Sequence, residues 1–215
     1  TALFDVRALH PRYGIGGADF SSTTDLTAAV VLFMLPNDPH IYVMAMFWLP
    51  EELLERRVRE DRIPYDLWKD QGYLRTCEGN KVRQKDVTDW FLEVQNDLDC
   101  YIYRGGYDAW SASYWVDEMQ ETFGKGVFTP VQQTMKVLSL PMKQLGADFD
   151  SKLIVYNNNP VLKWCLANTG IVEDKNGNIK PNKTSKARKR IDGLAALLDA
   201  FVVFQDCQDD YKSML

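Results

Sequence analysis

The stretch YGIGGADFSSTTDLTAAVVLFMLPNDPHIYVMAMFWL, residues 13–49, decides the fold. It contains three largely apolar runs, residues 13–20, 27–35 and 41–49, and the turn-forming segments 21–25 and 37–39 separate them. Connections this short join antiparallel neighbours. The middle run is almost wholly apolar, which predicts a central strand covered on both faces.

After residue 50 the hydrophobic period changes, and helices begin to alternate with strands. Apolar residues at three-to-four spacing predict helices, and short β-rich runs predict strands. The helices are expected at residues 50–61, 87–98, 111–123, 161–168 and 192–207, the strands at 73–77, 101–107 and 127–131, and a turn that could form a hairpin tip at 174–178. Three antiparallel strands followed by parallel ones predict an α/β protein with a mixed sheet and helices on both faces, which is the order of the ribonuclease H-like fold.

Length and composition favour an ordinary globular protein. The chain has 215 residues, of which 46% are hydrophobic and 26% charged, and this length favours a single domain over residues 1–215. No apolar run approaches the roughly 18 residues of a membrane span, and no leader peptide is recognisable, so we expect neither membrane insertion nor secretion. Four cysteines without a CxxC pair indicate reduced thiols in an intracellular protein. Because the first residue is Thr1 and not Met, we expect a piece of a longer protein.

The charge distribution is uneven. The net charge is −5, yet six basic and no acidic residues lie between positions 180 and 190: Lys180, Lys183, Lys186, Arg188, Lys189 and Arg190. A basic strip on an acidic body can bind phosphates of nucleic acid. It can equally be a solvated loop, and charge alone does not decide between the two.

Three aspartates stand out against the local pattern. Asp19 ends the first predicted strand, Asp108 ends the strand beginning at residue 101, and Asp192 begins the last helix. Taken singly, Asp108 and Asp192 suit helix N-caps and Asp19 suits the start of a turn. Taken together, they can converge at one edge of a mixed sheet and bind two Mg²⁺ or Mn²⁺ ions, as two-metal phosphodiester hydrolysis requires.

Other candidate chemistry finds little support. Asp199 lies seven residues after Asp192, about 10 Å along the same helix, and we expect it to be solvated or salt-bridged. His10 and His40 lie outside the acidic segments, so histidine-based nucleophilic catalysis is not indicated. A phosphate-binding loop is missing, because Gly124-Lys125-Gly126 lacks the earlier glycine.

An ordered set of motifs resembles the C-terminal nuclease domain of the large terminase subunit of tailed bacteriophages or prophages. The resemblance covers nearly the whole chain, and its segments are GGADFSSTTDLTA (16–28), FWLPE (47–51), PYDLW (64–68), TCEGN (76–80), YDAW (107–110), NPVL (159–162) and KRIDG (189–193). It implies a ribonuclease H-like nuclease, with the ATPase motor domain absent from this chain. It places the metal-binding acids of the family on Asp19, Asp108 and Asp192. One departure is Ala109-Trp110-Ser111 where the family often has Pro-Trp-Asn.

The expected activity is cutting of concatemeric double-stranded viral DNA during genome packaging in the host cytoplasm, with little sequence preference. The resemblance implies the motor domain, the small terminase subunit and the portal as partners, and no membrane. Lys183, Lys186, Arg188 and Lys189 are the expected DNA-backbone contacts. Two alternatives stay open: a transposase or resolvase that also joins strands, and a non-catalytic module that only docks DNA or the portal.

Overall fold

The computed structural model describes residues 3–20, 26–110, 115–183 and 190–215. Its first three strands are β1 (Tyr13–Asp19), β2 (Thr27–Phe33) and β3 (Ile41–Pro50), and they pair antiparallel in sequence order. All seven residues of β2 are buried. The prediction of a central strand covered on both faces is confirmed.

Four further strands complete a mixed sheet. They are β4 (Leu74–Cys77), β5 (Tyr101–Asp108), β6 (Phe128–Val131) and the short β7 (Ile154–Val155). β5 pairs parallel with β1 and β6 parallel with β5, whereas β4 and β7 each pair parallel with β3. The order β4-β3-β2-β1-β5-β6 confirms the ribonuclease H-like arrangement.

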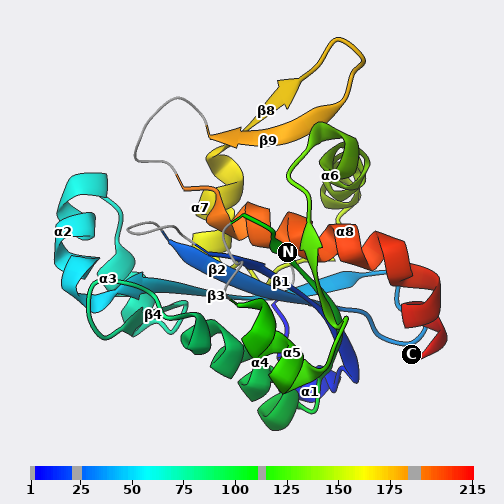
Figure 1. Ribbon diagram of the computed structural model, residues 1–215, viewed down its shortest axis with the longest axis horizontal. Coiled ribbons are helices and arrows are strands. Elements are labelled where there is room, and N and C mark those ends of the chain that lie inside the picture. Colours follow the sequence, from blue (N-terminus) through cyan, green and yellow to red (C-terminus); the bar gives the residue numbers. More distant parts are fainter. Residues whose placement is uncertain (1–2, 21–25, 111–114, 184–189) are drawn as a thin grey trace.

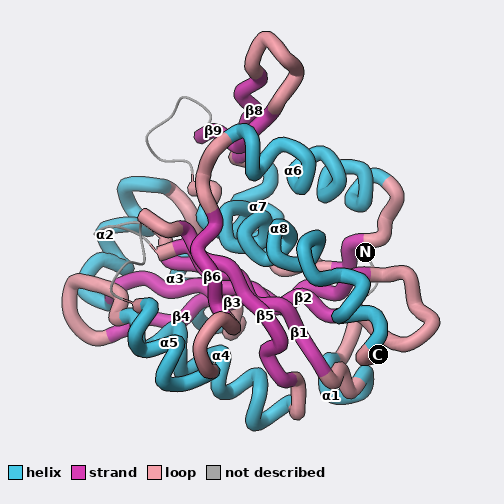
Figure 2. The backbone as a smooth tube through the Cα atoms, turned by 45° about the vertical axis from the view of Figure 1, so that its right-hand side comes forward, coloured by secondary structure: helices cyan, strands magenta, loops and turns pink. Residues whose placement is uncertain are grey.

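Helices cover both faces of this sheet (Figures 1 and 2). One face carries α4 (Gln84–Leu98) and α5 (Val116–Phe123), and the other carries α6 (Met135–Asp150), α7 (Pro160–Ala167) and the long α8 (Asp192–Ser213). The remaining helices α1 (Val6–Leu9), α2 (Glu51–Asp61) and α3 (Tyr65–Asp70) lie at the periphery. None of the described helices combines the length and apolar character needed to span a bilayer.

Strand alternation divides the core into two hydrophobic clusters. Ala28, Val30 and Leu32 of β2 pack in the cluster that includes α8, and Ala29 and Val31 pack in the cluster that includes α4. Successive strand residues point to opposite faces, so one apolar strand supplies both layers. The four cysteines are free, and all but Cys207 are buried.

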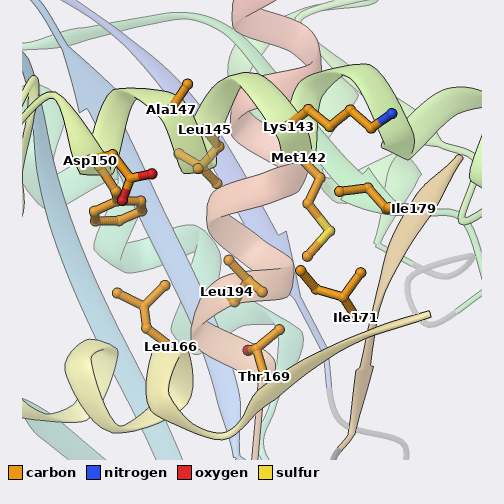
Figure 3. A pocket seen from close by; sticks show the side chains of 12 residues that line it. Met142, Lys143, Leu145, Ala147, Asp150, Leu166, Thr169, Ile171, Ile179 and Leu194 are labelled. Carbon is orange, nitrogen blue, oxygen red and sulfur yellow. The ribbon is translucent and has the colours of Figure 1, made fainter. Parts of the chain in front are cut away.

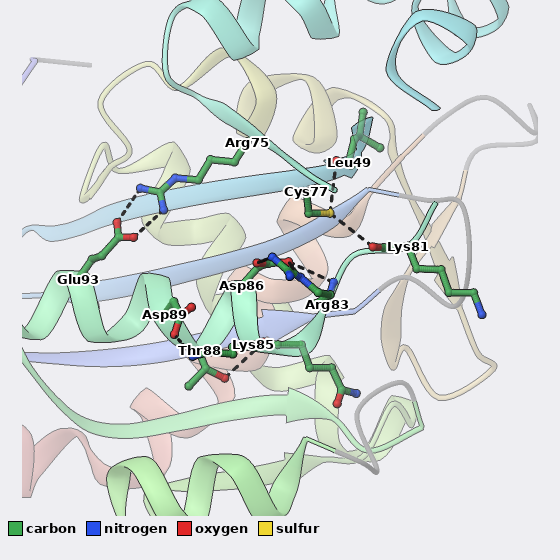
Figure 4. A network of polar contacts seen from close by, with 11 residues as sticks. Leu49, Arg75, Cys77, Lys81, Arg83, Lys85, Asp86, Thr88, Asp89 and Glu93 are labelled. Carbon is green, nitrogen blue, oxygen red and sulfur yellow. Dashed lines mark hydrogen bonds and ion pairs between the residues drawn. The ribbon is translucent and has the colours of Figure 1, made fainter. Parts of the chain in front are cut away.

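A polar network joins the edge strand β4 to α4 (Figure 4). Arg75 of β4 donates two hydrogen bonds to the Glu93 carboxylate of α4, at 2.9 and 2.7 Å. At the start of α4 Arg83 pairs with Asp86, whose carboxylate accepts from the Arg83 backbone N–H. Water reaches both pairs, since all four side chains are at least partly exposed, and we expect each pair to contribute at most about 1 kcal/mol.

A two-stranded hairpin, β8 (Thr169–Glu173) and β9 (Ile179–Lys183), projects beside α6 (Figure 1). Its tip confirms the turn expected at residues 174–178: Asp174 Oδ1 accepts from the backbone N–H of Asn176 and of Asn178, at 2.8 and 2.9 Å. Gly177 supplies a positive φ of 76° there. Lys143 of α6 donates to the carbonyl of Gly177 at 2.7 Å, which fastens the tip to that helix.

The sequence pattern did not predict α6. Leu138, Met142 and Leu145 do follow helical spacing and are buried, but Pro141 and Gly146 interrupt the pattern with residues that disfavour helix interiors. The free energy gained by packing the apolar side of α6 against α8 outweighs the low helix preference of both residues. The helices α1 and α3 and the strand β7 are too short to give a periodic signal.

Candidate functional site

Asp19 and Asp108 end neighbouring parallel strands. In the β1–β5 pairing Ala18 lies opposite Tyr107, and Asp19 and Asp108 are the next residue on each strand. Adjacent strands are about 4.8 Å apart. Two carboxylates distant in sequence therefore lie side by side at one edge of the sheet.

Both carboxylates belong to the face that α8 covers. Gly17 and Gly106 are partners in the β1–β5 register. A Cβ added to Gly17 would lie 2.1 Å from the carbonyl oxygen of Ala196, and one added to Gly106 would lie 2.6 Å from that of Asp199. Because side chains two residues apart share a face, Asp19 and Asp108 follow these glycines onto the α8 side. The glycines let the helix backbone approach the sheet directly.

The direction of α8 brings Asp192 to the same edge. Near the end of α8, Tyr211 donates from its hydroxyl to the carbonyl of Tyr13, at the start of β1, at 2.7 Å. Ala196, near the start of α8, meets Gly17, close to the end of β1. The helix thus runs antiparallel to β1, and its first residue lies toward Asp19. Asp192 is 5% exposed, whereas Asp19 and Asp108 are partly exposed.

The charges of two of these acids affect the thiol of Cys165 on α7. Burial raises the pKa of Cys165, the charges of Asp192 and Asp19 raise it further, and a hydrogen bond with the Gly193 backbone opposes them. Both carboxylates therefore lie within electrostatic range of one buried sulfur.

The helix-cap alternatives are wrong for Asp108 and Asp192. Ile191 is the N-cap of α8 and Asp192 is its first helical residue, while the N-cap of α5 is Trp115. Asp108 Oδ1 instead accepts a hydrogen bond from the backbone N–H of Trp110 at 2.9 Å, which stabilises the turn after β5. The segment 21–25, on which the turn alternative for Asp19 depends, lies outside the described residues.

The acids suit a hard divalent cation, but they are not yet a closed ligand set. Carboxylate oxygens are the donors that Mg²⁺ and Mn²⁺ prefer. Among the described residues, no three acid, histidine or cysteine side chains already form a cage that could hold a metal ion. Neighbouring carboxylates repel one another without a cation, so binding would have to draw them together.

The expectation that Asp199 is solvated or salt-bridged is wrong. Asp199 is 1% exposed; its Oδ1 accepts from Gln133 Nε2 at 2.9 Å, and its Oδ2 has no hydrogen-bond partner among the described residues. Burial raises the pKa of Asp199 well above its usual range, the Gln133 hydrogen bond opposes this shift, and the charge of Asp108 adds to it. One signal was present in the sequence, since Asp199 is the single polar residue in the apolar run LAALLDAFVVF, residues 194–204.

Asp199→Asn is expected to stabilise the protein at neutral and alkaline pH. Because the pKa of Asp199 is higher in the folded state, its protonation favours folding at acid pH, and this contribution is lost as the pH rises through the folded-state pKa. The variant should therefore exceed the wild type in free energy of unfolding at about pH 8, and the difference should shrink toward about pH 4, near the unfolded pKa. Urea denaturation across pH measures this. Asp206→Asn, an exposed acid on the same helix, should show no such trend; an equal trend in both variants would contradict the assignment.

The structure describes the basic strip only at its two ends. Lys183 is the last residue of β9, and Lys186, Arg188 and Lys189 lie outside the described residues. Arg190, the last residue of the strip, is buried. Its side chain is 7% exposed and forms an ion pair with Asp61 of α2. Asp61 is far from Arg190 in the sequence, so no local pattern predicts this pairing.

An apolar pocket of about 480 Å³ lies between α6, α7, the hairpin and α8. Figure 3 shows Met142, Ile171 and Leu194 gathered around it. None of the three candidate aspartates lines this pocket. The acidic edge of the sheet, and not this cavity, is therefore the candidate functional site.

Comparison with known proteins identifies the family of the chain. The family model of the terminase large subunit, endonuclease domain, matches residues 1–207. The large terminase subunit of Enterobacteria phage HK97 is 32% identical over 191 residues, covering 87% of this chain and 36% of that protein. This chain therefore spans about a third of the length of that relative.

Solved structures show the same similarity. The crystal structure of the HK97 large terminase superposes with a TM-score of 0.79 at 28% identity, covering 94% of this chain and 43% of that chain. The large terminase nuclease domain of bacteriophage SPP1, solved with bound Mn, gives 0.53 at 14% identity, covering 95% and 92%. The second likeness shows the fold alone. The chain belongs to the family of terminase large subunit endonuclease domains.

Proposed function

We propose that this chain is a divalent-metal-dependent endonuclease that cuts concatemeric double-stranded DNA during packaging of a viral genome. The observation that carries the proposal is the joint placement of Asp19, Asp108 and Asp192 by the β1–β5 register and the antiparallel course of α8, in a member of this endonuclease family. The SPP1 domain was solved with Mn, and the large terminase nuclease of the thermophilic phage G20c, a protein of similar fold, was solved with magnesium; both support Mg²⁺ or Mn²⁺ here.

The positions of the three acids suggest their roles. Asp19 on β1 has Asp108 of the neighbouring strand on one side, and the antiparallel course of α8 brings Asp192 toward it. Asp19 would therefore contribute to the binding of both cations, and Asp108 and Asp192 would contribute to one cation each. When bound, such ions lower the pKa of a coordinated water and neutralise the leaving oxygen of the phosphodiester.

A plasmid assay tests the activity. Supercoiled plasmid should be nicked and linearised with Mn²⁺ or Mg²⁺ and stay intact with EDTA. End-labelled duplexes then separate the rivals: a transposase or resolvase would give joined strands, whereas hydrolysis gives only shortened ones. A non-catalytic docking module would bind duplex DNA and show no heat of Mn²⁺ binding in calorimetry.

The basic strip gives a prediction about DNA binding. We assign Lys183, Lys186, Arg188 and Lys189 to the DNA backbone, because a phosphate contact needs positive charge and no particular base. Each change to Ala should weaken duplex binding and lower the slope of log K against log salt by about 0.9 for every phosphate that the variant no longer neutralises. Fluorescence anisotropy at several salt concentrations measures both. Lys125→Ala, an exposed lysine after α5, is the control, and unchanged slopes in all four variants would contradict the assignment.

The cellular setting follows from the same proposal. We assign the chain to the host cytoplasm, working with an ATPase motor domain outside this chain, the small terminase subunit and the portal. The motor would supply the translocated DNA, and the nuclease would cut it at the start and end of packaging.

A further inference from the structure

A buried ion pair joins the segment before α8 to the end of α2. Arg190 Nη2 lies 3.7 Å from Asp61 Oδ2, and the two side chains are 7% and 2% exposed. Tyr65 of α3 donates from its hydroxyl to the same Asp61 oxygen at 2.9 Å and also hydrogen-bonds with Arg190. We call Arg190, Asp61 and Tyr65 the latch.

Stability alone gives little reason for the latch. Removing two charges from water costs about as much as their attraction returns, so apolar replacements of a buried ion pair are often neutral or stabilising. Asp61 is also the last residue of α2, and an acid at a helix C-terminus is disfavoured by the helix dipole. We therefore look for the role of this buried ion pair in the position that it gives to the backbone around Arg190.

The latch fixes the start of α8. The Arg190 carbonyl accepts a hydrogen bond from Asn168 Nδ2, just after α7, at 3.0 Å, and Asp192 follows two residues later. The backbone at Gly193 is closely packed against β3 and α7. A Cβ added there would lie 2.9 Å from the Phe47 ring and 3.2 Å from Cys165 Cβ. The Arg190 side chain thus secures one side of this segment, and α7 and β3 secure the others.

We propose that Arg190, held by Asp61 and Tyr65, is a positioning residue that sets the place of Asp192 in the metal site. The inference rests on the proposed function, because it takes Asp192 as a cation ligand. Residues that orient metal ligands typically change metal affinity or activity by about 10- to 100-fold when they are replaced. The latch acts on Asp192 through the short segment that joins Arg190 to the start of α8.

The test separates positioning from stability. The double variant Asp61→Asn/Arg190→Met removes both buried charges and leaves an unbranched apolar side chain of similar volume at position 190, so its unfolding midpoint in urea should stay near that of the wild type. Its Mn²⁺ affinity, measured by calorimetry, should nevertheless fall about 10-fold, with a parallel rise in the Mn²⁺ concentration for half-maximal plasmid cutting. Val94→Ala, buried in α4 on the opposite face, should lose stability without losing Mn²⁺ affinity.

The outcomes distinguish failure of the latch inference from failure of the proposed function. A folded double variant with wild-type Mn²⁺ affinity overturns the latch inference and leaves the proposed function standing. A wild-type chain that binds no Mn²⁺ overturns the proposed function and the latch together. Should the double variant fail to fold, Tyr65→Phe keeps both charges and removes only the hydroxyl; lower Mn²⁺ affinity supports the latch, and unchanged affinity overturns it.

Discussion

Replacing Asp19 with Asn is expected to abolish DNA cutting. The change removes the charge of the acid that we assign to both cations, while the amide keeps the size of the side chain. Loss of a single transition-state hydrogen-bond donor already costs enzymes about 10²- to 10³-fold in rate, and loss of a ligand that serves both cations should cost at least as much. Plasmid nicking with Mn²⁺ measures the rate, and thermal unfolding checks that the fold is intact.

The matched control for this experiment is Asp206→Asn. It makes the same chemical change at an exposed acid near the far end of α8, so its cutting rate should equal that of the wild type. Mn²⁺ titration by calorimetry should show weakened binding for Asp19→Asn and unchanged binding for the control. Cutting by Asp19→Asn at the wild-type rate in Mn²⁺ would show that the assigned centre is wrong.

Among the substitutions proposed in this article, Gly17→Ala is expected to lower the free energy of unfolding most. The added methyl group would lie 2.1 Å from the Ala196 carbonyl oxygen and 2.7 Å from Ala200 Cβ. These are backbone and short side-chain atoms that cannot turn aside, so α8 itself would have to move away from β1. Overpacking usually costs about 1–3 kcal/mol, and we expect this substitution to reach or exceed the upper end. Urea denaturation measures the loss.

The same displacement should weaken cation binding, because α8 carries Asp192 toward Asp19. Gly146→Ala supplies the control: Gly146 lies inside α6 with nothing within 4 Å of an added Cβ. Alanine should stabilise that helix by about 0.5–1 kcal/mol. Equal changes in stability and cation affinity for Gly17→Ala and Gly146→Ala would mean that α8 does not pack closely against Gly17 of β1.

Much of the fold could be read from local pattern. Short turns between the first three runs predicted antiparallel pairing, and the change of period after Pro50 predicted helices between parallel strands. The helix α6 was missed because Pro141 and Gly146 weaken its local preference, while its packing partner α8 is about fifty residues away in the sequence. Local preference and tertiary packing disagreed there, and packing decided.

The candidate site shows the same division. Asp19, Asp108 and Asp192 could be selected because each ends or begins a predicted element, and such positions are set by short-range sequence. Asp199 was misjudged because a charged residue is normally solvated. Nothing in the sequence near Asp199 or Arg190 indicates that their partners are Gln133 and Asp61.

The sequence by itself therefore determined the succession of strands and helices and the three acids at their ends, because turns and hydrophobic periodicity act over a few residues. Only the tertiary structure decided that α8 runs antiparallel to β1 against Gly17 and Gly106, that Asp199 is buried, and that Arg190 is held by Asp61. These features depend on which distant surfaces meet. That is settled by close packing and by the cost of burying charge, and both act between residues far apart in the chain.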